Sequence, residues 1–459
     1  MGKSGAADPL AQLGRLGVVI AAATALLMAA CGSAGSDDDD PSTTAPSTTP
    51  AAGADLVRVP DDAPTIGAAV EQVNNGGLVL VAPGTYPEEV TINKSDVTLR
   101  GEDRNGTIID GEGSRSFGVF VSADGVRIEN LTVHSTLFYG VLVTGMHDEN
   151  GPLAHGGPGY TELNPEQFPP VERFAINHVT AYNNGLYGIY AFNARHGTIT
   201  DSYASGSADS GFYVGQCEEC DILVTANVAE RNAVGFENAN ASDSVMVAGN
   251  RFSGNRIGLT LLSSYQEAFT PQRENLVVGN LIMDNTSADS PAHAHGGFGL
   301  GVAISGGQRN DIVANHIAGH PSAGVVLSNA EDIPALDNQF RENVFGDNGV
   351  DVADTSATRA PTAGTCFETD GAATSSPTTL LDGPCPGGAG PASPDPGAVP
   401  EVITPPGISF LDVPAPPDQP NLADVEAIPD PLPATVELPD PADFAVPDTT
   451  LLSDRAGTP

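Results

Sequence analysis

The feature that most constrains the fold of this chain is a repeat of about 23 residues. Four successive segments within residues 173–264 each contain a short alternating apolar run, an Asn or Asp, a second apolar pair, a polar loop and a glycine. The repeat glycines Gly188, Gly211, Gly235 and Gly258 are 23, 24 and 23 residues apart by subtraction. A fixed period of this length is typical of stacked repeats, and alternation within a run is the period of a β-strand. The sequence therefore predicts an all-β solenoid, a parallel β-helix in which each turn, or rung, has three short strands and buries its inward side chains against its neighbours.

One polar residue recurs between the two apolar runs of each segment, at Asn177, Asp201, Asn227 and Asn250. Asn and Asp tolerate the left-handed backbone conformation that a tight turn between strands requires. Stacked rungs would also place these side chains above one another, close enough to hydrogen-bond. We expect these residues to turn the chain and to form a ladder.

The repeat pattern extends over residues 54–354, which we predict to be one β-helix. Residues 64–73 have apolar side chains at helical spacing and are followed by Asn-Asn-Gly-Gly, which favours the end of a helix. Because the terminal repeats of a solenoid must be capped, we expect a short helix to cover the N-terminal end of the stack.

Two gaps between repeat glycines exceed one rung: 48 residues from Gly140 to Gly188, and 43 residues from Gly258 to Gly301. The first excess lies in residues 146–172 and the second mainly in residues 284–297. Both insertions border the strand that follows the repeat glycine. Since insertions in solenoids map to loops that often form the binding face, we expect a site on this strand.

The N-terminal end differs in composition from the repeats. An apolar run over residues 16–28, too short to span a bilayer as a mature helix, is followed by Ala-Ala-Cys31-Gly-Ser. Small residues before a cysteine resemble a bacterial lipobox, and an ordinary secretory signal is the alternative. We expect a signal peptide over residues 1–30, lipidation of Cys31 and anchorage at the extracytoplasmic face of a bacterial membrane.

Composition also predicts that the two segments flanking the repeats do not fold. Residues 31–53 are rich in Ser, Thr, Ala, Pro and Asp, which is typical of a disordered acidic tether. Residues 355–459 form a Pro/Asp-rich, low-complexity acidic tail, which we expect to be disordered or a stiff extension.

The formal net charge of −40, from 18 Lys and Arg against 58 Asp and Glu, limits the partners of the chain. Such a field repels nucleic acid and anionic membranes. We therefore expect no nucleic-acid partner, contact with a membrane only through the lipid, and a monomer. The same field would repel a polyuronide unless a cation or local arginines intervene.

Four further cysteines lie beyond Cys31. Cys217 and Cys220 form a CxxC at a rung corner, but no second pair or His follows at the spacing of a zinc site, and the helix of a thioredoxin-like motif is missing. We expect a disulfide that closes this turn. Cys366 and Cys385 would form a second disulfide in an oxidising compartment.

Two stretches carry a resemblance to known proteins. The segment Ala82-Pro-Gly-Thr-Tyr-Pro-Glu-Glu-Val-Thr-Ile is similar to the opening of many right-handed parallel β-helix proteins of the pectin-lyase-like superfamily. Tyr187-Gly-Ile-Tyr and Asp209-Ser-Gly-Phe-Tyr-Val-Gly-Gln resemble a subgroup of bacterial exported β-helix repeat proteins. The resemblance covers residues 55–354 and implies a right-handed coil. It implies no particular activity, because no intact catalytic motif of the polygalacturonases, pectin methylesterases or alginate epimerases is found in the chain.

Alternation in the strand after each repeat glycine divides its side chains between two faces. If Ile189, Phe212 and Phe236 point inward, the residues after them form an outward column. That column comprises Leu142, Tyr190, Tyr213, Glu237, Thr260, Ala303 and Val326. Adjacent rungs are about 4.8 Å apart, so two tyrosines and a carboxylate on successive rungs would form a sugar-binding strip. Tyrosines and isolated carboxylates are also ordinary on strands of an acidic protein, which is the alternative interpretation.

The strip predicts roles for the residues around it. In an enzyme, Glu237 or Asp209 would be the general acid or base, or the two would form a hydrolase pair. Tyr213 or Tyr190 would transfer a proton in an elimination or epimerisation, and Arg195 would bind a uronate carboxylate. The expected catalytic residues are Glu237, Asp209 and Tyr213, and the expected substrate-binding residues are Tyr190, Phe192, Asn193, Arg195 and Gln216.

Histidines in the two insertions raise a metal site as an alternative. His147 and His155 lie in the first insertion, and His293 and His295 lie in the second. A His-x-His in a glycine-rich loop can bind a transition metal, and the resemblance extends to periplasmic copper-associated β-helix proteins. The insertions are anchored about five rungs, or roughly 24 Å, apart, so both would have to fold over the groove to share one ion. We assign no metal ligands and leave the cofactor open, with calcium favoured over a transition metal.

Together these observations predict a lipid-anchored cell-envelope β-helix protein that binds or modifies a polysaccharide or cell-wall glycan. As an enzyme it would be a polysaccharide lyase, an epimerase or a glycoside hydrolase. A non-catalytic surface, adhesion or structural module and a metal-handling envelope protein of the copper type are the alternatives.

Overall fold

A computed structural model describes residues 53–153, 161–369, 374–382, 385 and 396–457. The expected signal peptide, Cys31 and the tether as far as Ala52 lie outside the described residues, as does His155. Within the described ranges, no helix is both long and apolar enough to cross a membrane.

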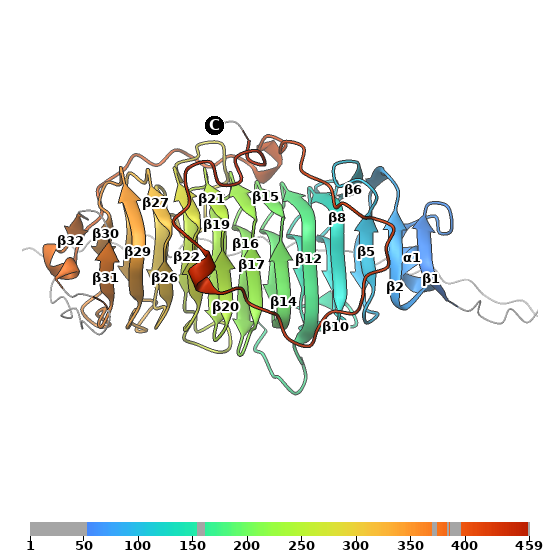
Figure 1. Ribbon diagram of the computed structural model, residues 1–459, viewed down its shortest axis with the longest axis horizontal. Coiled ribbons are helices and arrows are strands. Elements are labelled where there is room, and N and C mark those ends of the chain that lie inside the picture. The colour runs from blue at the N-terminus through green and yellow to red at the C-terminus, as the bar shows by residue number, and fades with distance from the viewer. Residues whose placement is uncertain (1–52, 154–160, 370–373, 383–384, 386–395, 458–459) are drawn as a thin grey trace, which may run out of the picture. The chain divides into compact units, whose positions relative to one another are not determined.

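The described chain coils into a parallel β-helix whose walls are an 11-stranded and a 19-stranded sheet (Figure 1). The 11-stranded sheet consists of β4 (Val90–Ile92), β7 (Phe117–Val121), β9 (Tyr139–Val143), β13 (Tyr187–Phe192), β16 (Ser210–Cys217), β19 (Val234–Ala241), β22 (Ile257–Leu262), β25 (Leu300–Ser305), β28 (Ala323–Ser328), β30 (Val352–Asp354) and β32 (Ser375–Ser376). Each strand pairs in parallel with the next strand of this series, so one strand of every rung lies in this sheet.

The 19-stranded sheet contains the other two strands of each rung. It consists of β1 (Ala54–Val59), β2 (Val73–Val81), β3 (Gly84–Tyr86), β5 (Thr98–Gly101), β6 (Thr107–Asp110), β8 (Val126–His134), β12 (Val171–Tyr182), β14 (Ala194–Thr200), β15 (Tyr203–Ser205), β17 (Ile222–Thr225), β18 (Val228–Glu230), β20 (Val245–Ala248), β21 (Arg251–Ser253), β23 (Leu276–Val278), β24 (Leu281–Met283), β26 (Asp311–Val313), β27 (His316–Ala318), β29 (Gln339–Gly346) and β31 (Cys366–Thr369). The long strand β12 pairs with both β14 and β15, because it runs through a corner that other rungs make with two short strands. The predicted count of three strands per rung is therefore confirmed.

The predicted alternation is also observed in the 11-stranded sheet. Ile189, Phe212 and Phe236 pair on successive rungs and are fully buried in the interior of the coil. The residues after them pair in the same register and form the outward column of Leu142, Tyr190, Tyr213, Glu237, Thr260, Ala303 and Val326.

The corner between the two columns of short strands carries an asparagine ladder. The backbone N–H of Asn227 donates to Oδ1 of Asn250, 3.0 Å away. The same bond, 2.9 Å long each time, joins Asn250, Asn280, Asn315 and Asn343 in order. Because every ladder amide is buried, each of these bonds satisfies a backbone N–H that water cannot reach.

Two of the four residues expected in this ladder have other roles. Asp201 lies one residue before the ladder position and has the left-handed conformation, with φ of 50°. Its neighbour Ser202 takes the ladder place and donates its N–H to Asn227. Asn177 lies within β12 and accepts a hydrogen bond from Thr200. The ladder prediction is thus confirmed for Asn227 and Asn250 and wrong for Asn177 and Asp201.

A second ladder, absent from the sequence predictions, lies at the corner that precedes the 11-stranded sheet. The N–H of Asn232 donates to Asn255 and that of Asn255 donates to Asn285, at 3.1 and 3.0 Å. Asn285 is also hydrogen-bonded to the ring of His320, which replaces an asparagine in the next rung. Burial lowers the pKa of His320 to about 4, so this imidazole is neutral. The second insertion begins at this ladder.

The predicted N-terminal cap is the helix α1 (Ile66–Gln72). The hydroxyl of Thr65 accepts a hydrogen bond from the N–H of Ala68, and the carboxylate of Glu88 accepts from Ile66 and from Gly67. These acceptors satisfy N–H groups that the first turn of a helix leaves free. The helix buries its apolar side chains against the first rungs and so closes the core.

The C-terminal end of the coil lies beyond the expected boundary at Asp354. Strands β31 and β32 add a further partial rung, followed by the short helix η1 (Thr378–Leu381), which buries Leu380. A disulfide joins Cys366 of β31 to Cys385, and a second one joins Cys217 to Cys220. These are the two pairings expected from the sequence.

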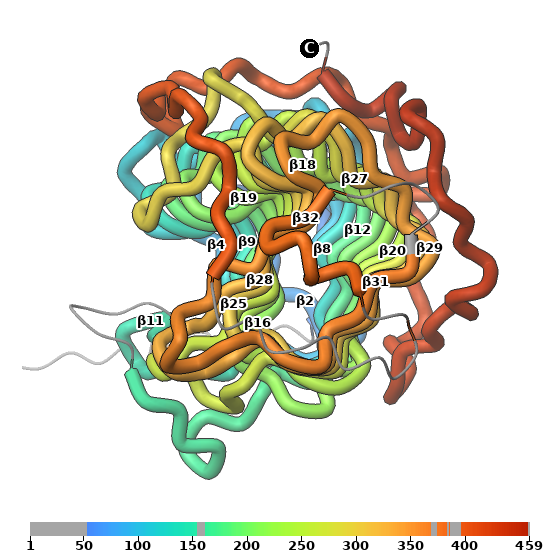
Figure 2. Tube along the Cα trace, turned by 90° about the vertical axis from the view of Figure 1, so that its left-hand side faces the viewer, coloured from blue at the N-terminus to red at the C-terminus, as the bar shows by residue number. Residues whose placement is uncertain are grey.

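The tail does not behave as its composition predicts. Residues 396–457, which we call the strap, run along the outside of the coil toward its N-terminal end and back (Figures 1 and 2). The strap contains two short 3₁₀ helices, η2 (Phe410–Asp412) and η3 (Pro441–Asp443). Arg100 donates to the carbonyls of Val425 and Ala427, at 3.0 and 2.7 Å, and other coil arginines bind the strap in the same way. Of the two expectations for the tail, disorder is therefore wrong for the strap, whereas the alternative of an extended segment agrees with its course along the coil.

Candidate functional site

The outward column lies where the sequence predicts but is not an open strip. Tyr190 and Tyr213 are 0% and 1% exposed, and Glu237 is 7% exposed. The rings of Tyr190 and Tyr213 lie 4.6 Å apart and pack in an apolar cluster with Phe192. These aromatic residues form a second core outside the coil, so they do not offer faces to a sugar.

The first insertion is one of the covers. It leaves the coil after β9, forms a hairpin from β10 (His147–Asp148) and β11 (Gly151–Pro152), and projects from the side of the coil in Figure 2. Its apolar residues Met146 and Phe168 pack on the aromatic cluster. The expected strip is buried because the insertion folds back onto it.

Two predicted substrate-binding residues hold this cover in place. The amide of Asn193 donates to the carbonyl of Phe168, 3.1 Å away. Gln216 donates to the sulfur of Met146 and accepts from the N–H of Ala268, both at 2.9 Å. Because both side chains are buried and hydrogen-bonded to loops, their role is structural and the expected sugar contact is corrected.

Arg195 is also already paired. Its Nη2 lies 2.5 Å from Oε1 of Glu172 and its Nε lies 3.1 Å from the same oxygen. A cavity of about 440 Å³ adjoins it, lined by Pro165, Pro170, Asn193, Arg195, Cys217, Glu218, Glu219 and Phe269. The expected uronate partner of Arg195 is therefore replaced by a carboxylate of the protein itself.

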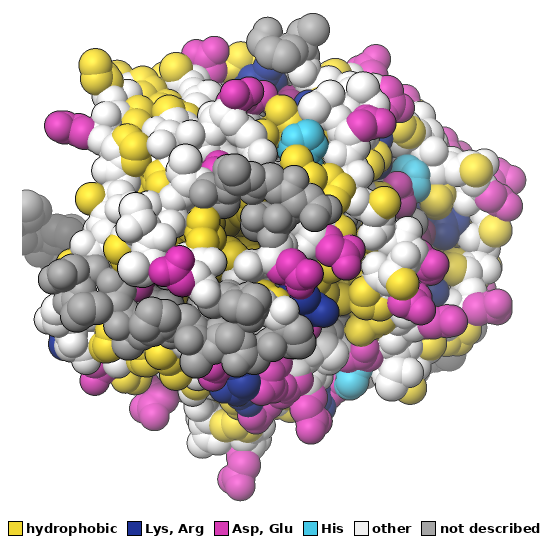
Figure 3. Space-filling view, turned by 60° about the vertical axis from the view of Figure 1, so that its left-hand side comes forward, with side chains coloured by type: hydrophobic (Ala, Val, Ile, Leu, Met, Phe, Trp, Pro, Cys, Tyr) yellow, Lys and Arg dark blue, Asp and Glu magenta, His cyan; other side chains and the backbone are white. Residues whose placement is uncertain are grey.

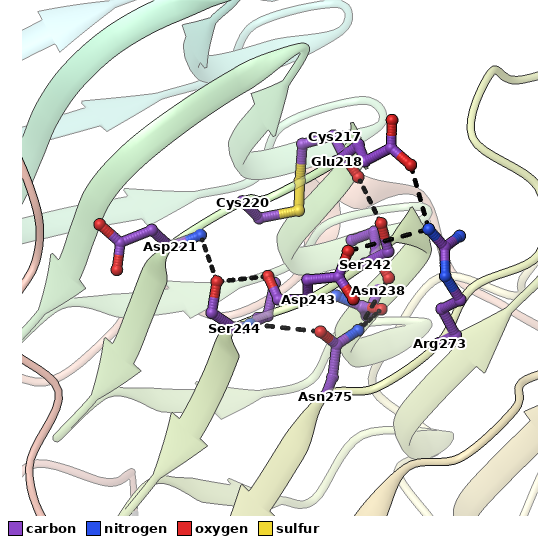
Figure 4. The surroundings of a disulfide bond; sticks show 12 residues. Cys217, Glu218, Cys220, Asp221, Asn238, Ser242, Asp243, Ser244, Arg273 and Asn275 are labelled. Atoms are coloured by element: carbon purple, nitrogen blue, oxygen red, sulfur yellow. Dashed lines mark hydrogen bonds and ion pairs between the residues drawn. A yellow bond between two sulfur atoms is a disulfide. The ribbon is translucent and has the colours of Figure 1, made fainter.

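The disulfide between Cys217 and Cys220 forms the corner of the rung next to this cavity (Figure 4). Arg273 lies between Glu218 and Asp243 there, 3.1 and 3.8 Å from their carboxylate oxygens. The disulfide and the ion pairs together fix the corner, from which Glu218 and Glu219 line the cavity.

Three titratable side chains meet at the start of β16. Asp209 precedes this strand, Glu237 lies in β19 and His293 comes from the second insertion. Nε2 of His293 is 3.4 Å from Oδ1 of Asp209, and one donor atom of each of the three residues lies within 4.8 Å of the other two. The hydroxyl of Ser210 is 2.7 Å from Glu237 Oε2 and 3.3 Å from Asp209 Oδ1, so it bridges the carboxyl groups.

The surroundings raise the pKa of Glu237 and lower the pKa of Asp209. Burial raises the pKa of Glu237 to about 8, and the charge of Asp209 adds to this effect. Burial alone would raise the pKa of Asp209, but hydrogen bonds and charge from His293, with further hydrogen bonds from Glu237 and Ser210, outweigh it and lower that pKa. The contact with Asp209 raises the pKa of His293 against the effect of burial. At neutral pH the site therefore combines a protonated Glu237 with an ionised Asp209, beside an imidazole whose pKa is raised by that carboxylate.

The three side chains of the site differ in exposure. The side chains of Asp209 and His293 are 20% and 17% exposed, whereas Glu237 lies behind them. We call Asp209, Glu237 and His293 the acid–base cluster. Its donors, two carboxylates and one imidazole, are also groups that bind divalent metal ions.

The expected role of Tyr213 in proton transfer is not supported. Its hydroxyl donates to Oε1 of Glu267, 2.8 Å away, in the loop that follows β22. Burial, and then the charge of Glu267, raise the pKa of Tyr213 well above its ordinary value. Burial also raises the pKa of Glu267 to about 8. Tyr213 is thus a buried, permanently protonated partner of a loop.

The position of His293 beside Asp209 and Glu237 was not expected from the sequence. The insertion that contains it precedes β25 but reaches back to β16, three strands away in the 11-stranded sheet. The sequence feature that could have indicated this position is the His-x-His motif of His293 and His295, in an insertion beside the outward column. His295 is exposed, 5.4 Å from His293 between ring centroids, and His147 of the first insertion is exposed beside Phe120.

Comparisons with known proteins agree with this architecture. The sequence matches the family described as "Right handed beta helix region" over residues 117–266 and again over 169–345. No curated protein matches the chain in sequence.

Solved structures of low similarity are found as well. The ORF18 protein of Geobacillus virus E2 has 15% identity and a TM-score of 0.46, over 69% of this chain and 62% of that one. The A-module of the mannuronan C-5 epimerase AlgE6 of Azotobacter vinelandii has 17% identity and a TM-score of 0.43, over 68% and 83% of the two chains. Pectate lyase Pel9A has 18% identity and a TM-score of 0.40, over 63% and 72%. This chain spans less than two thirds of the viral protein, and none of these likenesses carries an activity over to it.

The period of the glycines, the parallel rungs around one buried core and the family match all lead to one assignment. The chain is a right-handed parallel β-helix protein, and its residues 117–345 match the right-handed β-helix family.

Proposed function

We propose that this protein is a glycoside hydrolase that acts on a neutral polysaccharide at the acid–base cluster. One observation carries the proposal: two neighbouring carboxyl groups have pKa values driven apart, with Glu237 protonated and Asp209 ionised at neutral pH. Such a pair supplies a general acid and a nucleophile or base in one site. Glu237 would protonate the leaving oxygen and Asp209 would attack the anomeric carbon or activate water.

The spacing of the carboxyl groups favours retention of anomeric configuration. Oxygen atoms of Asp209 and Glu237 approach within 4.8 Å. Inverting enzymes place a water between carboxyl groups that are about 6.5–9.5 Å apart, whereas retaining enzymes hold them about 5–5.5 Å apart. Because carboxyl groups this close leave no room for the water of an inverting mechanism, Asp209 is the nucleophile in this proposal, and His293 orients it.

The charges of the chain favour a neutral sugar over a uronate. Elimination or epimerisation removes a proton next to a uronate carboxylate, and that charge needs a cation to stabilise it. Of the 18 Lys and Arg, Lys3 and Arg15 lie outside the described residues. Each of the others has a carboxylate, carbonyl or hydroxyl partner within the protein. Acidic side chains are spread across the face shown in Figure 3, with few basic ones among them.

The test is to incubate the full mature protein with neutral, amino and uronic polysaccharides and to identify products by mass spectrometry and NMR. We expect cleavage of a neutral polymer with retained configuration, and turnover that falls as pH rises through about 8, where Glu237 loses its proton. Glu237→Gln and Asp209→Asn should each lower kcat by about 10²–10⁴-fold. Glu267→Gln is the control, because this carboxyl group is equally buried but binds Tyr213. Binding of a glycan without any product would instead favour the non-catalytic surface module.

A metal centre is the second candidate, because one donor atom from each of three side chains lies within 4.8 Å of the others. A metal ion that binds Glu237 must displace its proton, so the affinity for the metal should fall as pH falls. Titration with Zn²⁺, Cu²⁺ and Ca²⁺, followed by calorimetry, separates the two candidates. Stoichiometric binding that His293→Gln abolishes would move the assignment to a metal protein.

We also propose that the protein is lipid-anchored at the extracytoplasmic face of a bacterial membrane, as a monomer. Two disulfides that use four of the five cysteines support an oxidising compartment and leave Cys31 for lipidation. Metabolic labelling with a fatty acid tests this proposal, since Cys31→Ser should abolish the label.

A further inference from the structure

The strap meets the second insertion beside the acid–base cluster, at a buried arginine. Arg256 lies between the ladder residue Asn255 and β22, and it is 1% exposed. Its Nε donates to the hydroxyl of Ser290 at 3.0 Å and its Nη2 donates to the carbonyl of Ser290 at 3.3 Å. The same guanidinium donates to the strap carbonyls of Pro405 and Pro406, each at 2.9 Å. One side chain thus joins three segments that are far apart in the sequence.

The strap also contacts the insertion directly. The N–H of Ile408 donates to the carbonyl of Ser290 at 3.1 Å. At Gly407 the backbones are so close that an added Cβ would lie 2.3 Å from the N atom of Ala292 and 2.7 Å from its Cβ. Only glycine fits at this approach, because a methyl group would collide with backbone atoms that cannot move independently.

The insertion is held on both sides of its histidine. On the N-terminal side, Ser290 is bound by Arg256 and the strap. On the C-terminal side, the N–H of Gly299 donates to the carbonyl of Arg256 at 2.9 Å, and the Arg256 guanidinium lies 5.6 Å from the centre of the Phe298 ring. His293 lies between these two attachments. Its reach to Asp209 therefore depends on where Arg256 and the strap hold the loop.

We propose that Arg256 and strap residues 405–408 position His293 against Asp209, so that the acid–base cluster is complete only when the strap is seated. The catalytic meaning of this arrangement rests on the proposed function. The position of His293 can be measured without turnover, because its imidazole titrates and the loop amides exchange with solvent.

The experiment compares variants of the full-length mature chain by NMR titration of His293 and by hydrogen exchange over residues 284–299. Gly407→Val should displace the strap from the loop without removing any side-chain partner. We expect it to bring the pKa of His293 down toward the ordinary value, since the contact with Asp209 keeps it raised. Hydrogen exchange at the amide of Gly299 should become at least about tenfold faster, because a loosened loop breaks the hydrogen bond from this amide to the carbonyl of Arg256 more often. Arg256→Ala should have the same two effects. Arg256→Lys should show both effects to a smaller extent.

Arg251→Ala is the matched control, because Arg251 also donates to two strap carbonyls, those of Thr449 and Leu451, while toward the insertion it has only an electrostatic interaction with Asp284, nine residues before His293. It should leave both measurements unchanged. An unaltered His293 titration in Gly407→Val would overturn the proposal, and so would an equal effect of Arg251→Ala. If the titration shifts in Gly407→Val while glycan cleavage continues at the wild-type rate, the positioning holds and the catalytic role of His293 fails.

Discussion

Replacing Glu237 with glutamine should change how stability depends on pH. Burial and the charge of Asp209 raise the pKa of Glu237 from 4.5 to about 8 in the folded chain. Between these two values the folded state keeps a proton that the unfolded state releases. The stabilising contribution of this proton is therefore complete below about pH 4.5, declines as pH rises, and is lost by about pH 8. Each pKa unit corresponds to about 1.4 kcal/mol, so the stability lost over this window is on the order of 5 kcal/mol.

Glutamine resembles the protonated carboxyl group in size and charge but does not titrate. Glu237→Gln therefore removes the contribution of this proton to the pH dependence of stability. Asp209, His293, Glu267 and Tyr213, which face Glu237, are left in place. Unfolding by denaturant, followed by circular dichroism at pH 5, 6, 7 and 8, measures the difference between variant and wild type. That difference should shift in favour of the variant by about 1.4 kcal/mol for each pH unit.

Glu401→Gln, which changes an exposed strap carboxylate, is the control and should leave the pH dependence unchanged. Parallel curves for Glu237→Gln and wild type across this range would show that Glu237 titrates as an ordinary carboxyl group. The basis for assigning it as the general acid would then be lost.

Three further changes test the structural assignments. Cys366→Ala with Cys385→Ala opens a loop of about 20 residues and should cost about 3 kcal/mol by loop entropy in thermal or chemical unfolding. Asn250→Ala leaves buried groups of the ladder without partners and should cost about 2–4 kcal/mol, whereas Asn177→Ala at the strand surface should cost about 0.5 kcal/mol. Tyr213→Phe should lower stability by about 1–3 kcal/mol, because Glu267, a buried carboxyl group, loses its hydrogen-bond donor. The variant should leave kcat within about twofold, because the Tyr213 hydroxyl does not transfer a proton in the proposed reaction.

The parts of the fold that follow from local rules could be predicted from the sequence. Strand alternation and the glycine period determine which side chains share a face, and the outward column from Leu142 to Val326 has the register that they imply. Asn227 and Asn250 were found because a stacked repeat places equal residues above one another. Asp201 could not be distinguished from them, because asparagine and aspartate suit both the turn and the ladder.

Exposure of the column could not be predicted in the same way, because it depends on loops that fold back from elsewhere. The pattern that places Tyr190 and Tyr213 outside the coil says nothing about the first insertion, which buries them. Likewise His293 reaches a strand three positions away in the sheet, and no spacing in the sequence encodes where an insertion ends. The proximity of Asp209 and Glu237 therefore follows from the strand register, whereas the position of His293 beside them does not.

The strap shows why composition was misleading for the tail. A Pro- and Asp-rich segment cannot bury enough apolar surface to fold alone, and the strap forms no sheet. What it offers is backbone carbonyls, which every residue has, and the donors are arginines of the coil such as Arg100, Arg251 and Arg256. The side chains that hold the strap in place therefore belong to the coil, so the composition of the tail does not reveal them. The same bonds engage the scarce arginines of an acidic chain, so every described Lys and Arg already has a partner within the protein, and this supports our proposal of a neutral glycan instead of a uronate.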